Sequence, residues 1–180
     1  MTRLSHSHLS SQQFRWGSLV LFVATFWISV SLFLDLLMMP MMYESGMMAE
    51  PGFASAGYGL FWMFNRVEMI CAAAILTGLL ALHQRLRDRL QTVIVSGSRS
   101  RWALGIGGLL LVITLAYTYL LTPEMSALGL SLSVETGKVA VPEAMGWMHA
   151  AYWSLEVLKI VAIAGLLKLC YRDVAAEFSG

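Results

Sequence analysis

The sequence predicts an all-α integral membrane protein, a four-helix bundle with both termini in the cytoplasm, and three observations support this fold class. First, 58% of the 180 residues are hydrophobic and 13% are charged, with a mean hydropathy of +0.68; a soluble domain usually has about 25% charged residues. Second, the chain holds four apolar stretches, each near the roughly 20 residues that a helix needs to cross a bilayer. Third, Lys and Arg gather on one side of these stretches. We therefore expect a single membrane domain, 1–180, with no soluble catalytic domain.

The first span is expected over residues 17–42, after a tail that carries Arg3 and Arg15. Its apolar stretch is longer than a secretory signal, and no A-x-A cleavage pattern follows it. We therefore expect this span to remain attached as a membrane anchor.

The remaining spans are expected over residues 58–82, 102–122 and 147–170. The connection after the second span is rich in arginine: Arg85, Arg87, Arg89, Arg99 and Arg101. Short loops rich in Lys and Arg stay on the cytoplasmic side. The opposite side collects acidic residues, namely Glu44, Glu50, Glu124, Glu135 and Glu143. This asymmetry places both termini in the cytoplasm, and the membrane would be a bacterial inner membrane or a thylakoid membrane.

Polar and ionisable residues inside the spans are the strongest indication of a site. A charged side chain at the bilayer centre costs roughly 2.5 to 3.5 kcal/mol on insertion scales, so each one needs a partner or a purpose. At 1.5 Å per residue, the three carboxylates of this set lie at a similar depth, about 10 to 15 Å below the outer surface. The predicted polar cluster is Asp35, Asn65, Arg66, Glu68, Glu156 and Lys159. It is either an ion-pair network that fixes helix register or a cofactor, metal or proton site.

A second candidate site is the outer end of the bundle, where most of the 12 methionines lie. Thioether and imidazole ligands suit Cu(I). The predicted ligands are Met38, Met42, Met145, Met148 and His149. The alternative interpretation is that these methionines fill irregular gaps where helices splay around Pro40.

Several stretches resemble a known family: WISVSLFLDLLMMPMMY, FWMFNRVEM, HQRLRDR and WMHAAYWSLEVLK. In their order they resemble the small four-helix membrane proteins similar to transmembrane protein 205, a family distantly similar to copper-resistance D-type proteins and to a haem-binding protoporphyrinogen oxidase. The resemblance implies a role with a metal or a tetrapyrrole. Haem with two axial ligands would need a partner for His149, such as Met38 or Met42, so Cu(I) is favoured over haem.

These observations favour a small accessory or binding protein, not an enzyme, that handles a metal ion, a cofactor or a partner complex at its outer, periplasmic or lumenal face. The alternative is an intramembrane oxidoreductase or a transporter that uses Asp35, Glu68, Glu156 and His149 as a proton or metal path. The expected partners are the lipid bilayer and either further copies of the chain or a larger membrane complex. No nucleic acid is expected, and the identity of the cofactor stays open.

Overall fold

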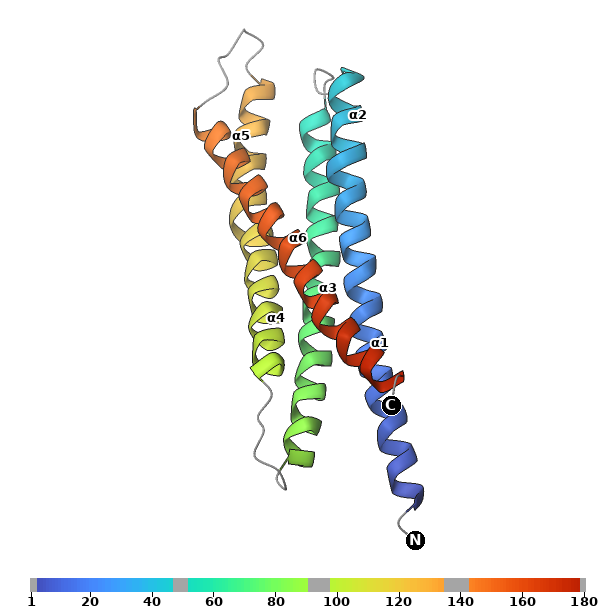
Figure 1. Cartoon of the computed structure of the whole chain (residues 1–180). Helices are drawn as coiled ribbons and strands as arrows, with labels where there is room; N and C mark the ends of the chain where they lie inside the picture. Colours follow the sequence, from blue (N-terminus) through green and yellow to red (C-terminus); the bar gives the residue numbers. More distant parts are fainter. Residues whose placement is uncertain (1–2, 47–51, 91–97, 135–142, 179–180) are drawn as a thin grey trace.

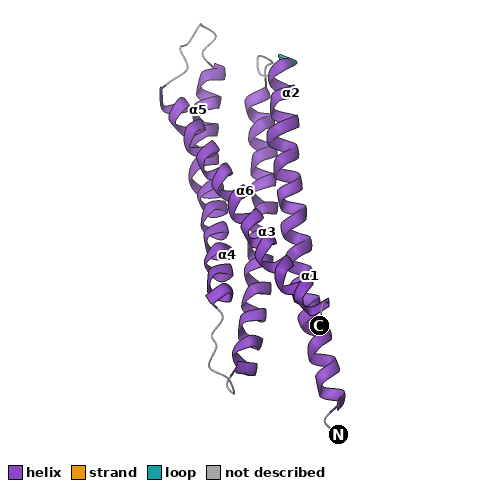
Figure 2. Cartoon of the chain, viewed as in Figure 1, coloured by secondary structure: helices purple, strands orange, loops and turns teal. Residues whose placement is uncertain are grey.

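The first two long helices of the chain form one hairpin. The computed structural model describes residues 3–46, 52–90, 98–134 and 143–178, and these residues contain helices and turns but no strand (Figure 2). We call each continuous run of helix a rod. The first rod has a π-helical segment, η1, near its outer end. Its elements are α1 (Arg3–Phe33), η1 (Leu34–Met38) and α2 (Met39–Glu44). The second rod is α3 (Phe53–Leu90).

The second hairpin repeats this plan. Its first rod is interrupted by a π-helical segment, η3, and its second rod is one long helix. The elements are α4 (Ser98–Ala116), η3 (Tyr117–Leu121), α5 (Thr122–Val134) and α6 (Glu143–Phe178). The all-helical class expected from the sequence is confirmed, and the helices extend beyond the expected spans at both ends.

Three of the four rods have stretches that are long and apolar enough to cross a membrane: Trp16–Met42, Ser55–Gln84 and Ser100–Gly129. These stretches contain the first three expected spans. The fourth expected span, 147–170, lies within α6, which is not among them. This part of α6 carries Glu156, Lys159 and Lys168.

The long helix α6 crosses the other rods diagonally (Figure 1). It begins beside α5, packs against α4, and ends beside α1. The other close pairs are α1 with α3 and α3 with α4. Because each hairpin returns to its starting side, the Arg3 end of α1 and the Phe178 end of α6 lie at the same end of the molecule (Figure 1).

The apolar core lies in the half of the molecule nearer those two ends. It is built from buried side chains of all four rods, among them Val20, Ala72, Ile75, Leu110 and Ile163. Two glycines allow the close approach of helices there. A Cβ atom on Gly78 would lie 2.6 Å from Val20 Cγ2, and one on Gly107 would lie 3.0 Å from Leu79 Cδ1. A side chain at Gly78 would therefore force α1 and α3 apart.

Each π-helical segment ends two residues before a proline. In η1 the widened turn closes with a hydrogen bond from the Met39 amide to the Leu34 carbonyl, and Pro40 follows. In η3 the Thr122 amide donates to the Tyr117 carbonyl, and Pro123 follows. Proline has no amide hydrogen, and its ring clashes with the carbonyl four residues earlier. Widening the preceding turn relieves that clash, so the helix continues past the proline.

Candidate functional site

A buried ionic cluster joins the two hairpins near the middle of the molecule. At its centre is Lys159 of α6, which is 0% exposed. Its ammonium group donates to Glu68 Oε1 on α3, and it lies 2.7 Å from Glu156 Oε2, one turn earlier on α6. Both carboxylates are 1% exposed. One cation therefore pairs with two carboxylates from different helices.

The first hairpin holds Glu68 with two further donors. Trp27 Nε1 of α1 donates to Glu68 Oε1 at 2.9 Å, and Ser31 Oγ donates to the same oxygen at 3.3 Å. Together with Lys159, these groups give one buried oxygen three hydrogen-bond donors. Such charge-assisted hydrogen bonds are shorter and stronger than neutral ones. The position of Glu68 is therefore set by α1, α3 and α6 together.

Both π-helical segments supply a side chain to the cluster. Tyr117, the first residue of η3, donates its hydroxyl to Glu156 Oε2 at 3.1 Å. Asp35, the second residue of η1, is 6% exposed, and its carboxyl is close enough to that of Glu156 for their charges to repel each other. Widened turns of this kind occur often at functional sites.

Two carboxyl oxygens of the cluster have no hydrogen-bond partner among the described residues. They are Asp35 Oδ2 and Glu156 Oε1, and both are buried. Leaving a buried polar atom unpaired costs about 1 to 3 kcal/mol, and more for a charged group. Two facing carboxyls cannot satisfy each other unless a proton or a cation lies between them. These two oxygens are therefore the unsatisfied hydrogen-bond acceptors of the cluster among the described residues.

Aromatic rings cover the cluster on its outer side. Tyr152 lies one turn above Glu156 on α6, with its ring centroid 5.1 Å from that of Tyr117 and 6.1 Å from that of Phe61. The Lys159 ammonium lies 5.4 Å from the centroid of the Tyr117 ring. Access to the carboxyl pair from the outer side therefore passes the Tyr117 and Tyr152 side chains.

The structure brings together four of the residues that the sequence placed in the polar cluster and separates the other two. Asp35, Glu68, Glu156 and Lys159 are gathered. Asn65 is buried but donates to Thr122 Oγ1 at 2.6 Å, which ties α3 to α5 nearer the outer end. Arg66 is exposed and stacks on the Trp62 ring, 3.8 Å from its centroid. Arg66 is therefore not a partner of the buried carboxylates.

Trp27, Ser31 and Tyr117 belong to the cluster but were not predicted as site residues. Trp27 and Ser31 precede Asp35 by eight and four residues, which puts all three on one helical face. That spacing was a usable signal. Nothing comparable marks Tyr117, because its contact with Glu156 depends on how η3 and α6 pack.

The predicted metal ligands are divided between two separate parts of the outer end. Met38 ends η1 and Met42 lies in α2, whereas Met145, Met148 and His149 lie in α6. Within the described residues, α2 and α6 are not in contact. His149 is exposed, and its Nδ1 lies 2.8 Å from the Met145 carbonyl of its own helix. In the part of the chain that the structure describes, no three His, Cys, Asp or Glu side chains are grouped to hold a metal ion.

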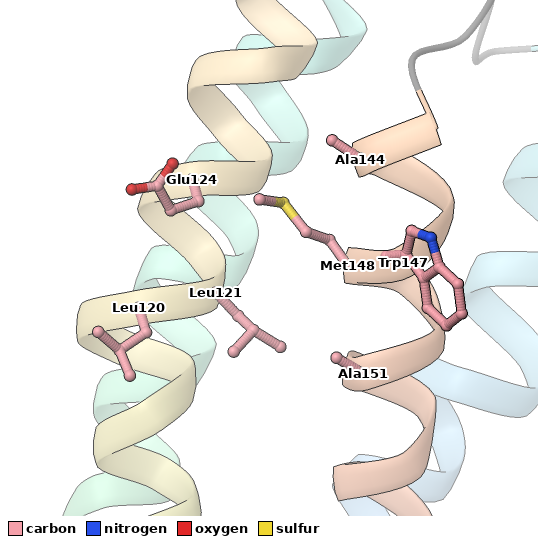
Figure 3. A pocket seen from close by; sticks show the side chains of 7 residues that line it. All are labelled: Leu120, Leu121, Glu124, Ala144, Trp147, Met148 and Ala151. Carbon is pink, nitrogen blue, oxygen red and sulfur yellow. The ribbon is translucent and has the colours of Figure 1, made fainter.

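An open pocket of about 420 Å³ lies between the outer part of α6 and the rod formed by η3 and α5 (Figure 3). Leu121 and Met148 point into it from opposite sides (Figure 3). Its lining is almost entirely apolar: Leu120, Leu121, Glu124, Ala144, Trp147, Met148 and Ala151. Met148 therefore faces η3 and α5 within the second hairpin and does not face Met38 or Met42.

In the part of the chain that the structure describes, fold and site together define an all-helical protein with three helices long and apolar enough to cross a membrane and a buried carboxylate–lysine cluster between its hairpins. Comparison with protein-family models, with curated proteins and with solved structures finds no match. The resemblance to the family of transmembrane protein 205 stays a prediction.

Proposed function

We propose that this chain is a four-span integral membrane protein with both termini in the cytoplasm, and that its buried cluster binds and passes protons. The topology is supported by the three apolar stretches, by the arginine-rich connection between the hairpins, and by the common position of the Arg3 and Phe178 ends. In this arrangement α6 is the fourth span, and its Glu156 and Lys159 are stabilised by groups that they meet on η3 and α3.

The observation that carries the proton proposal is the pair of unpartnered oxygens on Asp35 and Glu156. A proton placed between these carboxyls converts a repulsive contact into a hydrogen bond, with one carboxyl as donor and the other as acceptor. The two carboxyls are close enough to repel each other when both are ionised, and a shared proton removes that repulsion.

The excess of negative charge in the cluster favours proton binding over a purely structural role. With every group ionised, Asp35, Glu68 and Glu156 oppose the single positive charge of Lys159. An ion-pair network that only fixed helix register would need no third carboxyl. In membrane proteins, buried ionisable residues beyond those needed for pairing mark proton relays and ion pathways.

A proton fits the two unsatisfied acceptors better than a metal ion does. Calcium takes six to eight oxygen ligands and magnesium requires octahedral geometry, whereas the cluster offers two free carboxyl oxygens. The ammonium group of Lys159 lies 2.7 Å from the other oxygen of Glu156 and repels a cation there. The outer-face copper or cofactor role expected from the sequence has less support, because its ligands lie on helices that do not meet.

Transport by a four-helix chain requires more than one copy, because alternating access normally uses two larger bundles that move against each other. A homo-oligomer, or a larger membrane complex, is therefore part of this proposal. The cluster lies between the hairpins within one chain, so each copy carries a complete carboxyl pair.

The proposal is tested with Asp35→Asn, whose amide can donate to Glu156 as a protonated carboxyl would. Infrared difference spectra recorded while the pH is raised should show the loss of a protonated-carboxyl C=O band in the wild type and no such loss in Asp35→Asn. Glu124→Gln is the matched control, because Glu124 is an exposed carboxylate outside the cluster, and it should retain the band.

In liposomes with an imposed pH gradient, the wild type should carry a proton flux well above that of empty liposomes, and Asp35→Asn should reduce it at least tenfold. A band whose loss persists in Asp35→Asn would mean that a group other than Asp35 binds the proton. A wild-type flux equal to that of empty liposomes would leave the cluster with a packing role only.

A further inference from the structure

The exposed face of α3 carries an arginine at a depth where the chain is otherwise apolar. Arg66 lies within the membrane-crossing stretch Ser55–Gln84 and is exposed. Its neighbours on this face are large apolar side chains, with Met63 66% exposed and Ile70 67% exposed. At 1.5 Å per residue, Arg66 lies about 12 Å below Tyr58 at the outer end. The charged Arg66 side chain therefore starts from a lipid-facing position within the hydrocarbon region.

The side chain of Arg66 is directed toward the outer surface. Its guanidinium carbon lies 3.8 Å from the centroid of the Trp62 ring, and Trp62 is one turn nearer the outer end of α3. Long cationic side chains in membranes extend toward the headgroups in this way. Stacking on an aromatic face adds about 0.5 to 2 kcal/mol and holds the guanidinium plane in place. The pair is thus organised before any ligand arrives.

In the described part of the chain, Arg66 has no carboxylate partner, since the salt bridges there are those of Lys159 with Glu68 and Glu156. The guanidinium group has five N–H donors, and stacking on a ring satisfies none of them. In hydrocarbon such donors need acceptors, and the phosphates of lipid headgroups can supply them. A guanidinium binds phosphate through two parallel hydrogen bonds.

We propose that Arg66 and Trp62 form a binding site for the headgroup phosphate of an anionic phospholipid of the outer leaflet. We choose an anionic lipid because of charge complementarity. Among the described residues, no negative group on the exposed face of α3 balances the positive charge of Arg66. A zwitterionic lipid brings its own cation, which competes with Arg66 for the same phosphate. The site depends only on α3 crossing the membrane and is independent of the proton-binding cluster.

The experiment measures lipid retention by the purified full chain in detergent, using native mass spectrometry with phosphatidylglycerol or phosphatidylcholine added. The wild type should retain phosphatidylglycerol in preference to phosphatidylcholine, and Arg66→Gln should lose about tenfold in affinity for it. Arg66→Lys should fall between the two, because an ammonium group keeps the charge but not the paired hydrogen bonds. Arg101→Gln, an exposed arginine near the opposite end, is the matched control and should bind as the wild type does.

Equal retention of both lipids by the wild type, or unchanged retention in Arg66→Gln, would overturn the proposal. Competition by inorganic phosphate alone would show a general anion site in place of a lipid site. A cross-linked dimer that Arg66→Gln abolishes would assign the guanidinium to a carboxylate of a second copy instead.

Discussion

At the scale of single residues, Glu68 has the most partners in the cluster, because one of its oxygens accepts hydrogen bonds from Lys159, Trp27 and Ser31. Glu68→Ala would leave these three donors without that acceptor. Removing one member of a buried ion pair typically costs about 3 to 5 kcal/mol, so we expect a large fall in thermal stability in detergent. Glu124→Ala should change it by less than about 0.5 kcal/mol, as exposed substitutions usually do. A Glu68→Ala protein as stable as the wild type would mean that Lys159 does not depend on Glu68.

At the scale of elements, the contact between α1 and α3 depends on Gly78. The Cβ of Gly78→Ala would lie 2.6 Å from Val20 Cγ2, and a β-branched side chain has little freedom to move aside. We expect Gly78→Ala to lower stability by about 1 to 3 kcal/mol, as overpacking does. Gly105→Ala is the matched control, because a Cβ there meets nothing within 4 Å and alanine favours the helix by about 1 kcal/mol. Thermal unfolding of both variants should therefore move in opposite directions.

The same scale shows what could be predicted from the sequence. Asp35, Glu68, Glu156 and Lys159 were predictable, because ionisable residues inside apolar spans almost always face the bundle interior, where they meet one another. Arg66 could have been excluded, since residues two apart on a helix point to different sides and Glu68 faces inward. The separation of Met42 from His149 was not predictable, because it follows from the diagonal course of α6 across the other rods (Figure 1).

At the scale of the whole molecule, the proposed topology puts Ser45 outside and Gln84 in the cytoplasm. Both side chains are exposed, whereas the native Cys71 and Cys170 are buried. In intact cells or right-side-out vesicles, a membrane-impermeant thiol reagent should label Ser45→Cys but not Gln84→Cys, and inverted vesicles should give the opposite pattern. The unsubstituted protein is the control for the two native thiols. Labelling of both new cysteines from one side would contradict the hairpin arrangement.

The two widened turns also bear on how each rod tolerates changes in length. A π turn holds one residue more than the α-helical turn that it replaces, so η1 and η3 each correspond to a single inserted residue. Deleting one residue from η1 would therefore convert it to a regular α-helical turn and leave the residues beyond it at nearly the same azimuth. Asp35 lies at the start of that turn and Pro40 just after it. The extra residue of η1 thus alters the backbone locally, between Asp35 and Pro40, while the helix on either side keeps its direction.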